Sequence, residues 1–355
     1  MPIIISKARR ISFIVIEFCS NMPLIPTENP ASSPQLLLVI VMNPNKAGFD
    51  DFYEIAKEVQ RLAPNIAISI VTHRDNAAAV QENRWNWPTL TVGIGTALGR
   101  FTPPRGSIMQ GRAVKKIEQF ARFISLGIDT PLTARLDAKQ HYDPQAWGEF
   151  VILKPLPLSL NSTGAGVKLV RTARLNELNR QNGLADFVGH DAPMLVQTFI
   201  DTGPFPTHWR ILTLFGRALY SMKFWCPIQR PELTASDEEI ENTIIETKHP
   251  DLKKSFGMRD MRVLATEPEM LRFAVRVSKA FPTVPLQGID ILKEDKTGRL
   301  FALEINGGGN VWHFSSKRSA LGRAGGITRE DRIAQFGAWE VAARSLIEAT
   351  TRYAS

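Results

Sequence analysis

The stretch FALEINGGGN, residues 301–310, places an acid and an amide on an apolar strand that runs into three glycines. Glu304 and Asn306 are two positions apart, so on a β-strand both side chains point to the same face. The preceding stretch LQGIDILKEDKTGRL (286–300) predicts the other arm of a hairpin that turns on EDKTG. If the arms pair about 296–297, Asp290 lies opposite or diagonal to Glu304, with Cβ atoms about 5–8 Å apart.

Two carboxylates and an amide so close together on an apolar hairpin are unfavourable unless a cation joins them. Hard oxygen ligands of this kind suit Mg²⁺, which proteins usually share with substrate phosphates. We expect the apolar neighbours to occupy the opposite face: Ile289, Ile291, Leu303 and Ile305. The alternative, acids that simply face solvent, does not explain this one-sided arrangement. The hairpin therefore predicts a magnesium site.

A parallel α/β unit is expected before residue 110. LLLVIVMNP (36–44) is a continuous apolar run, typical of a strand buried on both faces. DFYEIAKEVQRLAP (51–64) has helical spacing, and IAISIVT (66–72) and TLTVGIG (89–95) predict two further strands. Strand, helix, strand in this order favours a parallel sheet.

The rest of the chain predicts a mixture of helices and antiparallel strands. A helix over 112–127 ends at Gly127, and strands follow at 151–155, 167–170 and 194–200. A hairpin over 208–225 turns on Phe-Gly-Arg, and polar residues 236–260 are expected to be helical with loops. Amphipathic helices are predicted at 268–281 and 329–350. We predict a loosely ordered extension (1–34), an N-terminal α/β domain (35–110), a small lid subdomain (111–195) and a C-terminal subdomain (196–355).

Because proteins usually share Mg²⁺ with substrate phosphates, we expect phosphate-binding groups elsewhere in the chain. Lys154 ends the strand VILK and is followed by Pro155, which restricts its backbone. By itself this lysine could be a core-edge residue whose ammonium reaches water. The loop NSTGAGV (161–167) adds glycines, hydroxyls and backbone N–H groups suited to a polyphosphate. It matches neither a P-loop nor a dinucleotide-binding fingerprint.

Composition narrows the function classes. With 44% hydrophobic and 22% charged residues the chain can bury a core, and two cysteines, Cys19 and Cys226, cannot build a disulfide scaffold. The net charge of +8 favours anionic partners, but the basic residues are dispersed and lack interleaved aromatics, so no nucleic-acid partner is expected. SKARRISFIVIEFCSNMP (6–23) imitates a secretory signal, but its apolar run is short and contains Glu17. We expect a cytoplasmic protein with no membrane partner.

The order of these pieces resembles the ATP-grasp superfamily, which includes D-alanine–D-alanine ligase and glutathione synthetase. The matching pieces are GIDTP (127–131), VILKPL (151–156) with STGAGVKLV (162–170), LVQTFI (195–200), HWRILTLFGRAL (208–219), QGIDIL (287–292) and LEIN (303–306). The likeness covers about residues 111–310, and the preceding unit resembles the family's N-terminal domain. It implies an ATP-grasp fold, α+β in the ATP-binding part and α/β in the N-terminal domain.

The resemblance also implies residue roles. Lys154 and Arg210 would be catalytic contacts to the phosphates, and Asp290, Glu304 and Asn306 would be the metal ligands. The remaining nucleotide contacts would be Ser162, Thr163, Gly164 and Gly166 in the loop; Gln197, Thr198, Phe199 and Ile200 at the adenine edge; Asp201 at the ribose; Lys223 at the γ-phosphate; and Arg112 or Lys116 from the preceding helix.

The sequence departs from the family after Asn306. Many family members have a proline-containing segment there, whereas this chain has GGGNVWHFSSKR (307–318). Glycines let the backbone approach a ligand closely. Asn310, His313, Ser315 and Arg318 could line an acceptor pocket, and an ordinary exit loop is an equal alternative.

The function that the resemblance implies is an ATP-dependent carboxylate–amine ligase that forms an amide or peptide bond through an acyl phosphate. The expected cofactors are ATP and Mg²⁺, with Mn²⁺ as a substitute, and the expected partners are small-molecule or peptide carboxylates and amines. A homodimer is the base-rate expectation for the assembly. The alternatives are a phosphotransferase on the same fold and a non-catalytic ATP-binding regulator.

Overall fold

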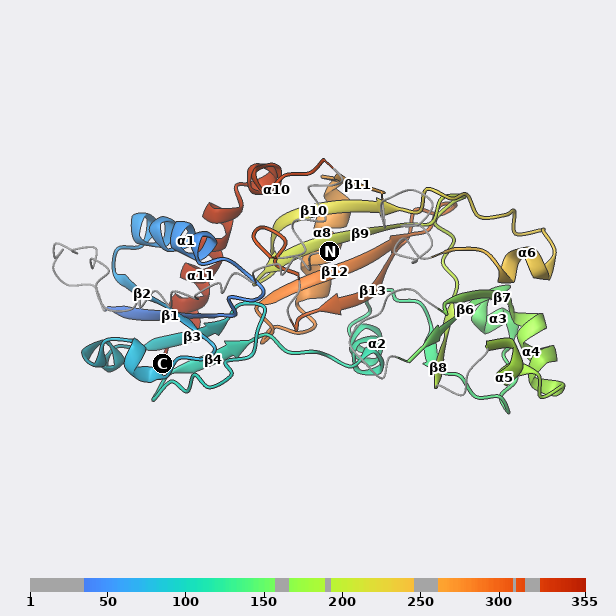
Figure 1. Ribbon diagram of the computed structural model, residues 1–355, viewed down its shortest axis with the longest axis horizontal. Coiled ribbons are helices and arrows are strands. Elements are labelled where there is room, and N and C mark those ends of the chain that lie inside the picture. The colour runs from blue at the N-terminus through green and yellow to red at the C-terminus, as the bar shows by residue number, and fades with distance from the viewer. Residues whose placement is uncertain (1–34, 157–165, 189–192, 246–260, 309–310, 317–325) are drawn as a thin grey trace, which may run out of the picture. The chain divides into compact units, whose positions relative to one another are not determined.

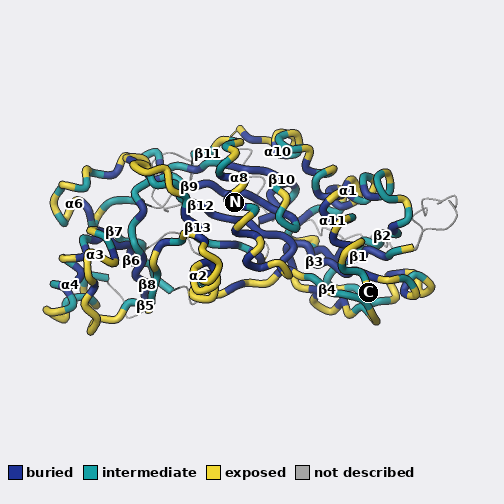
Figure 2. Tube along the Cα trace, turned by 180° about the vertical axis from the view of Figure 1, so that it is seen from behind, coloured by how far each residue is buried: buried dark blue, intermediate teal, exposed yellow. Residues whose placement is uncertain are grey.

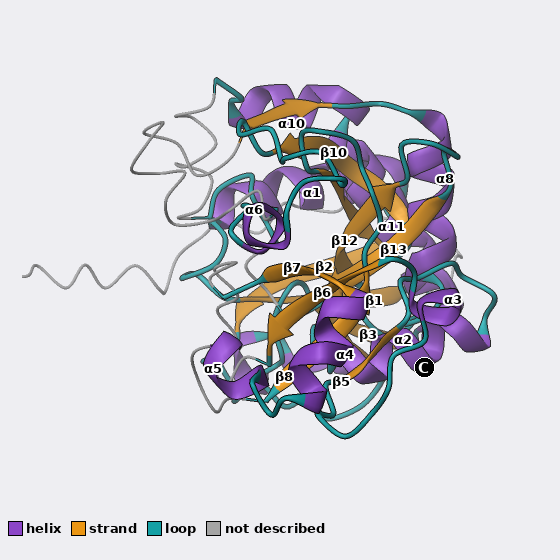
Figure 3. Cartoon of the chain, turned by 90° about the vertical axis from the view of Figure 1, so that its right-hand side faces the viewer, coloured by secondary structure: helices purple, strands orange, loops and turns teal. Residues whose placement is uncertain are grey.

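The computed structural model describes residues 35–156, 166–188, 193–245, 261–308, 311–316 and 326–355 (Figure 1). These residues form three sheets with strand orders β2-β1-β3-β4, β11-β10-β9-β12-β13 and β5-β8-β6-β7. The first sheet is parallel and the other two are antiparallel. Helices and strands are interspersed along the chain (Figure 3), so the mixed α/β class is confirmed. The predicted extension, residues 1–34, lies outside the described residues.

The parallel sheet contains β1 (Leu36–Met42), β2 (Ile66–Thr72), β3 (Thr89–Gly93) and β4 (Ser107–Gln110). As predicted, β1 is buried on both faces (Figure 2). Leu38, Ile40 and Met42 pack with α1 (Phe49–Leu62) and α11 (Ala338–Tyr353). The alternate residues of β1 face a second cluster that contains Trp85, from the 3₁₀ helix η2 (Glu82–Asn86), and Phe101. A shorter 3₁₀ helix, η1 (Ala77–Ala79), precedes η2.

The five-stranded sheet contains β9 (Thr207–Leu214), β10 (Arg217–Trp225), β11 (Met261–Leu264), β12 (Leu286–Lys293) and β13 (Leu300–Asn306). The predicted turn between β9 and β10 is formed by Phe215 and Gly216, both with positive φ. One face packs against α2 (Lys116–Ser125) and α8 (Pro268–Ser278). The opposite face continues into the core of the parallel sheet.

The third sheet contains β5 (Thr133–Arg135), β6 (Phe150–Pro155), β7 (Lys168–Arg171) and β8 (Met194–Thr198). Val151, Leu153 and Val196 on one face pack with residues of α3 (Pro144–Trp147), α4 (Thr172–Arg180) and α5 (Leu184–Val188). Ile240 of α6 (Asp237–Glu241) packs on the other face, with Phe150 and Ile152. The predicted domain boundary between residues 195 and 196 falls inside β8.

Two sequence expectations are wrong in detail. The helix predicted over 329–350 is broken at Gly337, whose φ of 65° is left-handed, into α10 (Arg329–Phe336) and α11. In the β12–β13 hairpin Asp290 pairs with Glu304 but Ile291 pairs with Ala302, so Leu303 is the extra residue of a bulge. Ala302, rather than Leu303, therefore joins Ile289, Ile291 and Ile305 in the apolar cluster. No helix in the described ranges is both long enough and apolar enough to span a bilayer.

Candidate functional site

Three neighbouring strands bring the predicted metal ligands together. Asp290 on β12 lies opposite Arg210 on β9 and opposite Glu304 on β13. Directly opposed residues on adjacent strands share a face of the sheet, so the three side chains form one cluster. Asn306, two residues beyond Glu304, joins the same face. The predicted convergence of Asp290 and Glu304 across the hairpin is confirmed.

Arg210 and Asp290 form a buried, two-pronged ion pair. The Arg210 Nε donates to Asp290 Oδ1 at 2.6 Å and its Nη2 donates to Oδ2 at 2.5 Å. Only 8% of Arg210 and 3% of Asp290 are exposed. Burial alone would lower the pKa of Arg210, but attraction to Asp290 and their hydrogen bonds outweigh it and raise the pKa above its usual value. The guanidinium therefore stays charged at neutral pH.

Glu304 and Asn306 complete the polar face. The Nζ of Lys116, the first residue of α2, lies 3.0 Å from Glu304 Oε2. The Asn306 Nδ2 donates to Asp290 Oδ2 at 3.2 Å and to Glu304 Oε1 at 3.4 Å, so one amide links the two carboxylates. Each acid of the cluster is thus paired with a cation, Asp290 with Arg210 and Glu304 with Lys116.

The donor chemistry of this cluster fits Mg²⁺. Asp290 and Glu304 are opposed across the hairpin, with the Asn306 amide bonded to both carboxylates, and rotating this amide about its last bond would exchange its nitrogen for its oxygen. Among the described residues no group of three or more His, Cys, Asp or Glu side chains could hold a metal. A cation here would therefore draw on the Asn306 amide and on phosphate oxygens, as Mg²⁺ commonly does.

A buried glutamine that the sequence did not single out holds this strand in place. Gln119 of α2 accepts a hydrogen bond from Ile305 N at 2.7 Å and donates to Ile305 O at 3.1 Å and Val114 O at 2.9 Å. Among the described strands β13 lies at the edge of its sheet, so these bonds satisfy backbone groups on the side away from β12. Ile305 lies between Glu304 and Asn306, so Gln119 fixes the backbone that carries both.

The glycines after β13 permit close packing. A Cβ on Gly307 would lie 2.5 Å from Val284 Cγ1 and 2.9 Å from Arg112 O. At Gly308 the Lys46 Nζ donates to the backbone oxygen at 3.0 Å. The end of β13 therefore passes against the segment before α2 and the loop that follows β1.

Asp51 of α1 anchors the segment beyond those glycines. It is fully buried and accepts hydrogen bonds from Trp312 Nε1 at 2.7 Å, from Arg329 Nη2 at 2.7 Å and from the Ser315 hydroxyl. Ser315 also accepts from Gly48 N at 2.7 Å. The Ser315 hydroxyl thus makes structural contacts to α1 and to the residue before it, and its acceptor-pocket role stays a prediction.

Of the other three acceptor candidates, His313 lies within the described residues. His313 is buried, with its ring stacked near Tyr220 at 6.2 Å between centroids. Asn310 and Arg318 lie outside the described residues.

The candidate nucleotide contacts on the third sheet have varied surroundings. Lys154 is half-buried near the end of β6, and buried Gln197 donates to Thr133 Oγ1 at 2.8 Å. The Thr198 and Phe199 N–H groups bond to Leu132 O and Phe150 O. The remaining candidates are placed as follows: Ile200 is buried, Gly166 is exposed with φ of 76°, and Ser162, Thr163 and Gly164 lie outside the described residues.

Asp201 has a structural partner. Its Oδ1 accepts from Arg230 Nη2 at 2.8 Å and from Gly203 N at 3.0 Å, and its backbone oxygen accepts from Asp295 N. The carboxylate therefore stabilises the turn after β8, and a ribose contact would have to share it with Arg230.

Two predicted phosphate contacts lie apart from the cluster. Lys223 pairs with Trp209, and its Nζ lies 5.0 Å from the Trp209 ring centroid. Trp209 packs on the α8 side of the sheet, opposite to the Arg210 face. Arg112 pairs with Glu118 at 3.2 Å on the surface. Of the pair Arg112 and Lys116, the structure therefore brings Lys116 to the acids.

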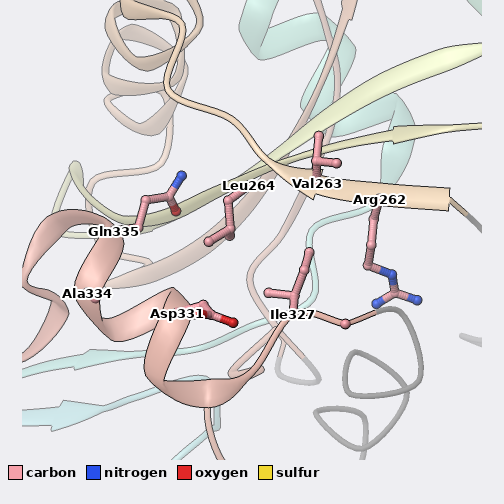
Figure 4. Close-up of a pocket in the computed structure, with 8 residues that line it drawn as sticks. Arg262, Val263, Leu264, Ile327, Asp331, Ala334 and Gln335 are labelled. Atoms are coloured by element: carbon pink, nitrogen blue, oxygen red, sulfur yellow. The ribbon is translucent and has the colours of Figure 1, made fainter.

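A separate hollow of about 540 Å³ lies between β11 and α10 (Figure 4). Arg262, Val263 and Leu264 line one side, and Ile327, Asp331 and Gln335 line the other. None of the predicted site residues lines it.

Comparison with solved structures returns remote likenesses. A D-cycloserine synthetase is 11% identical over 87% of this chain and 99% of its own, with a TM-score of 0.42. D-alanine–D-alanine ligase from Bacillus anthracis is 12% identical over 90% and 99%, with a TM-score of 0.41. A RiPP-associated ATP-grasp ligase from Chryseobacterium gregarium, in complex with ADP and a leader and core peptide, is 13% identical over 88% and 97%, with a TM-score of 0.44.

No protein-family model matches the chain, and no curated protein matches its sequence. The ATP-grasp ligases among the structural likenesses are of the superfamily that the sequence resembles. At these identities, and with TM-scores below 0.5, the likenesses carry no conclusion about activity. The activity has to be inferred from the residues of this chain.

Proposed function

We propose that this chain is an ATP-dependent carboxylate–amine ligase of the ATP-grasp type, with its metal and nucleotide phosphates held at the Asp290–Glu304–Asn306 face. The observation that supports the proposal most directly is the register of β9, β12 and β13. It sets two carboxylates, an amide and Arg210 on one face, with Lys116 added from α2. An acid pair flanked by fixed cations is suited to binding a metal–polyphosphate complex.

Each residue of the cluster has a proposed task. Asp290, Glu304 and Asn306 would hold Mg²⁺ or Mn²⁺, which when bound neutralises charge on the transferring phosphoryl group. Arg210, kept rigid and charged by Asp290, and Lys116 would orient the phosphates by charge. Lys154 would contribute a phosphate contact from β6. The loop over 159–166, which the resemblance assigns to the nucleotide phosphates, lies outside the described residues except for Gly166.

The proposed reaction has two steps. An oxygen of the substrate carboxylate attacks the γ-phosphorus of ATP, the bond to ADP breaks, and an acyl phosphate forms. The nitrogen of the amine then attacks the acyl carbon, inorganic phosphate leaves, and the amine gives up a proton as the amide forms. Neither step requires a nucleophile from the protein; positioning and charge do the work.

Hydroxylamine trapping tests the reaction class. The full chain is incubated with ATP, Mg²⁺, hydroxylamine and pools of amino acids, small peptides and carboxylated metabolites, and products are read by mass. A hydroxamate formed together with ADP supports the ligase. A phosphate ester would instead assign a phosphotransferase, and tight ATP binding with no turnover in any pool would assign a regulator.

A matched pair of variants tests the site. Glu304→Ala should fold normally and lose ATP turnover, because it removes an acid from the centre of the cluster. Glu118→Ala is the control, since Glu118 is an exposed acid on α2 paired only with surface Arg112 in the contacts described above. Wild-type turnover by Glu304→Ala would remove the metal assignment.

A further inference from the structure

The two ion pairs of the cluster differ in how firmly they are held. In the Arg210–Asp290 pair 10% and 4% of the side chains are exposed, and the guanidinium grips both carboxylate oxygens. In the Lys116–Glu304 pair 30% and 18% are exposed, and the ammonium reaches one oxygen. A planar, two-pronged, buried pair is a fixed element, whereas a lysine is a compact charge on a flexible stem. Of the two cations, Lys116 is therefore the more exposed and the more flexible.

The position of Lys116 on its helix points to an anion. It is the first residue of α2, where the helix dipole disfavours positive charge, and the preceding Lys115 provides no side-chain cap. A lysine there is stabilised by an acid, which Glu304 supplies, or by a phosphate, which the N–H groups at the start of a helix also attract. The same helix end therefore suits two alternative anions.

Gln119 holds Lys116 within reach of both alternatives. The two residues are three positions apart, so they project from the same side of α2. Gln119 is bonded to both backbone groups of Ile305, next to Glu304. The helix start is thus fixed beside the acid, and the Lys116 ammonium lies at the end of a flexible four-carbon stem.

The charge of the cluster couples the binding of the metal ion to the binding of the nucleotide. Asp290 and Glu304 are each paired with a cation, so a metal ion arriving alone adds positive charge to carboxylates that already have a positive partner. A nucleotide arriving with the metal supplies compensating negative charge and a new partner for the displaced lysine.

We infer that Lys116 is an exchangeable counter-ion of Glu304. Without nucleotide, its ammonium pairs with the Glu304 carboxylate at the place where the metal would bind. When a metal–nucleotide complex arrives, the ammonium moves to the phosphates. The inference rests on the proposed function. It makes Lys116 a competitor of the metal ion when nucleotide is absent and a phosphate ligand when nucleotide is present. Removing its charge should therefore shift the two affinities in opposite directions.

Mn²⁺ binding to the full chain, measured by electron paramagnetic resonance, tests this without reference to activity. Lys116→Met should bind Mn²⁺ alone about two- to fivefold more tightly than wild type, as expected for loss of a partly exposed ion pair. With ATP present, the same variant should bind Mn²⁺ less tightly than wild type. Lys115→Met, a change of the exposed neighbouring lysine, should match wild type in both measurements.

If Lys116→Met binds Mn²⁺ alone no more tightly than wild type does, and wild type binds Mn²⁺ in the presence of ATP, the exchange is wrong but the proposed site is not contradicted. Failure of wild type to bind Mn²⁺ even with ATP would overturn the proposed site itself. Lys116→Gln, which keeps a polar side chain, provides a second charge-removing variant and should follow Lys116→Met in both directions.

Discussion

Gln119→Leu removes the amide that holds the β13 backbone and keeps a side chain of similar size that favours a helix. Three hydrogen bonds disappear, at 2.7, 2.9 and 3.1 Å. The Ile305 N–H, the Ile305 C=O and the Val114 C=O then lack these partners in buried surroundings. At about 1 kcal/mol for each bond, the variant should lose about 3 kcal/mol of stability, and more where desolvation is complete.

The loss should be local to the strand that carries Glu304 and Asn306. Hydrogen exchange read by mass spectrometry reports this directly, because the peptide that spans β13 should lose protection while peptides from the parallel sheet should not. Mn²⁺ binding in the presence of ATP should weaken in parallel, since the ligand strand is no longer fixed.

Glu118→Leu is the matched control, because it places the same side chain at an exposed neighbouring position whose ion pair is about half exposed at each end. It should change stability by less than about 0.5 kcal/mol. If Gln119→Leu leaves exchange from β13 unchanged, or costs no more than this control, the proposed backbone clamp is wrong.

Three further outcomes are expected. Arg210→Met should lower the free energy of unfolding, measured with heat or urea, by about 3–5 kcal/mol, because it leaves Asp290 buried without this cation. The double variant Arg210→Met/Asp290→Leu should recover much of that loss, and additive effects of the two changes would contradict the ion-pair reasoning. Asp51→Asn should lower the free energy of unfolding by about 1.5–3 kcal/mol, because it weakens the hydrogen bonds that Trp312 and Arg329 donate to this carboxylate. Asp50→Asn, on the exposed side of the same helix, should change stability little, and equal effects of the two changes would refute the anchoring role. Hydrogen bonds from the backbone and hydroxyl of Thr328, the N-cap of α10, lower the pKa of Asp331. Wild type should therefore be more stable than Asp331→Asn above the usual aspartate pKa of about 4, and this advantage should disappear as the pH falls through the lowered pKa. An advantage that persists in acid would contradict this.

Much of the fold was predictable because each decisive element has a strong period or a clear stop. The continuous apolar run of β1 correctly predicted burial on both faces, and the hairpin prediction placed Asp290 opposite Glu304. Gly127, with φ of 62°, follows the end of α2 as its glycine predicted. In these places local propensity and tertiary packing agree.

The missed features depend on contacts between distant segments. β4 and β11 have four residues each, too few to show a period, and their strand character comes from pairing with β3 and β10. The bulge at Leu303 is a mismatch between two strands that neither strand reveals alone. In the sequence Gln119 is indistinguishable from any other polar residue of an amphipathic helix, and its partner Ile305 is 186 positions away.

The close packing of α11 with α1 and β1 has a consequence for synthesis on the ribosome (Figure 1). The apolar side of the first sheet emerges early, but the helix that completes its cover begins only at Ala338. At typical translation rates the nascent chain waits roughly 15–60 s between these events. A binder of exposed apolar segments should therefore associate with stalled chains that end before Ala338 and dissociate once the helix has cleared the exit tunnel.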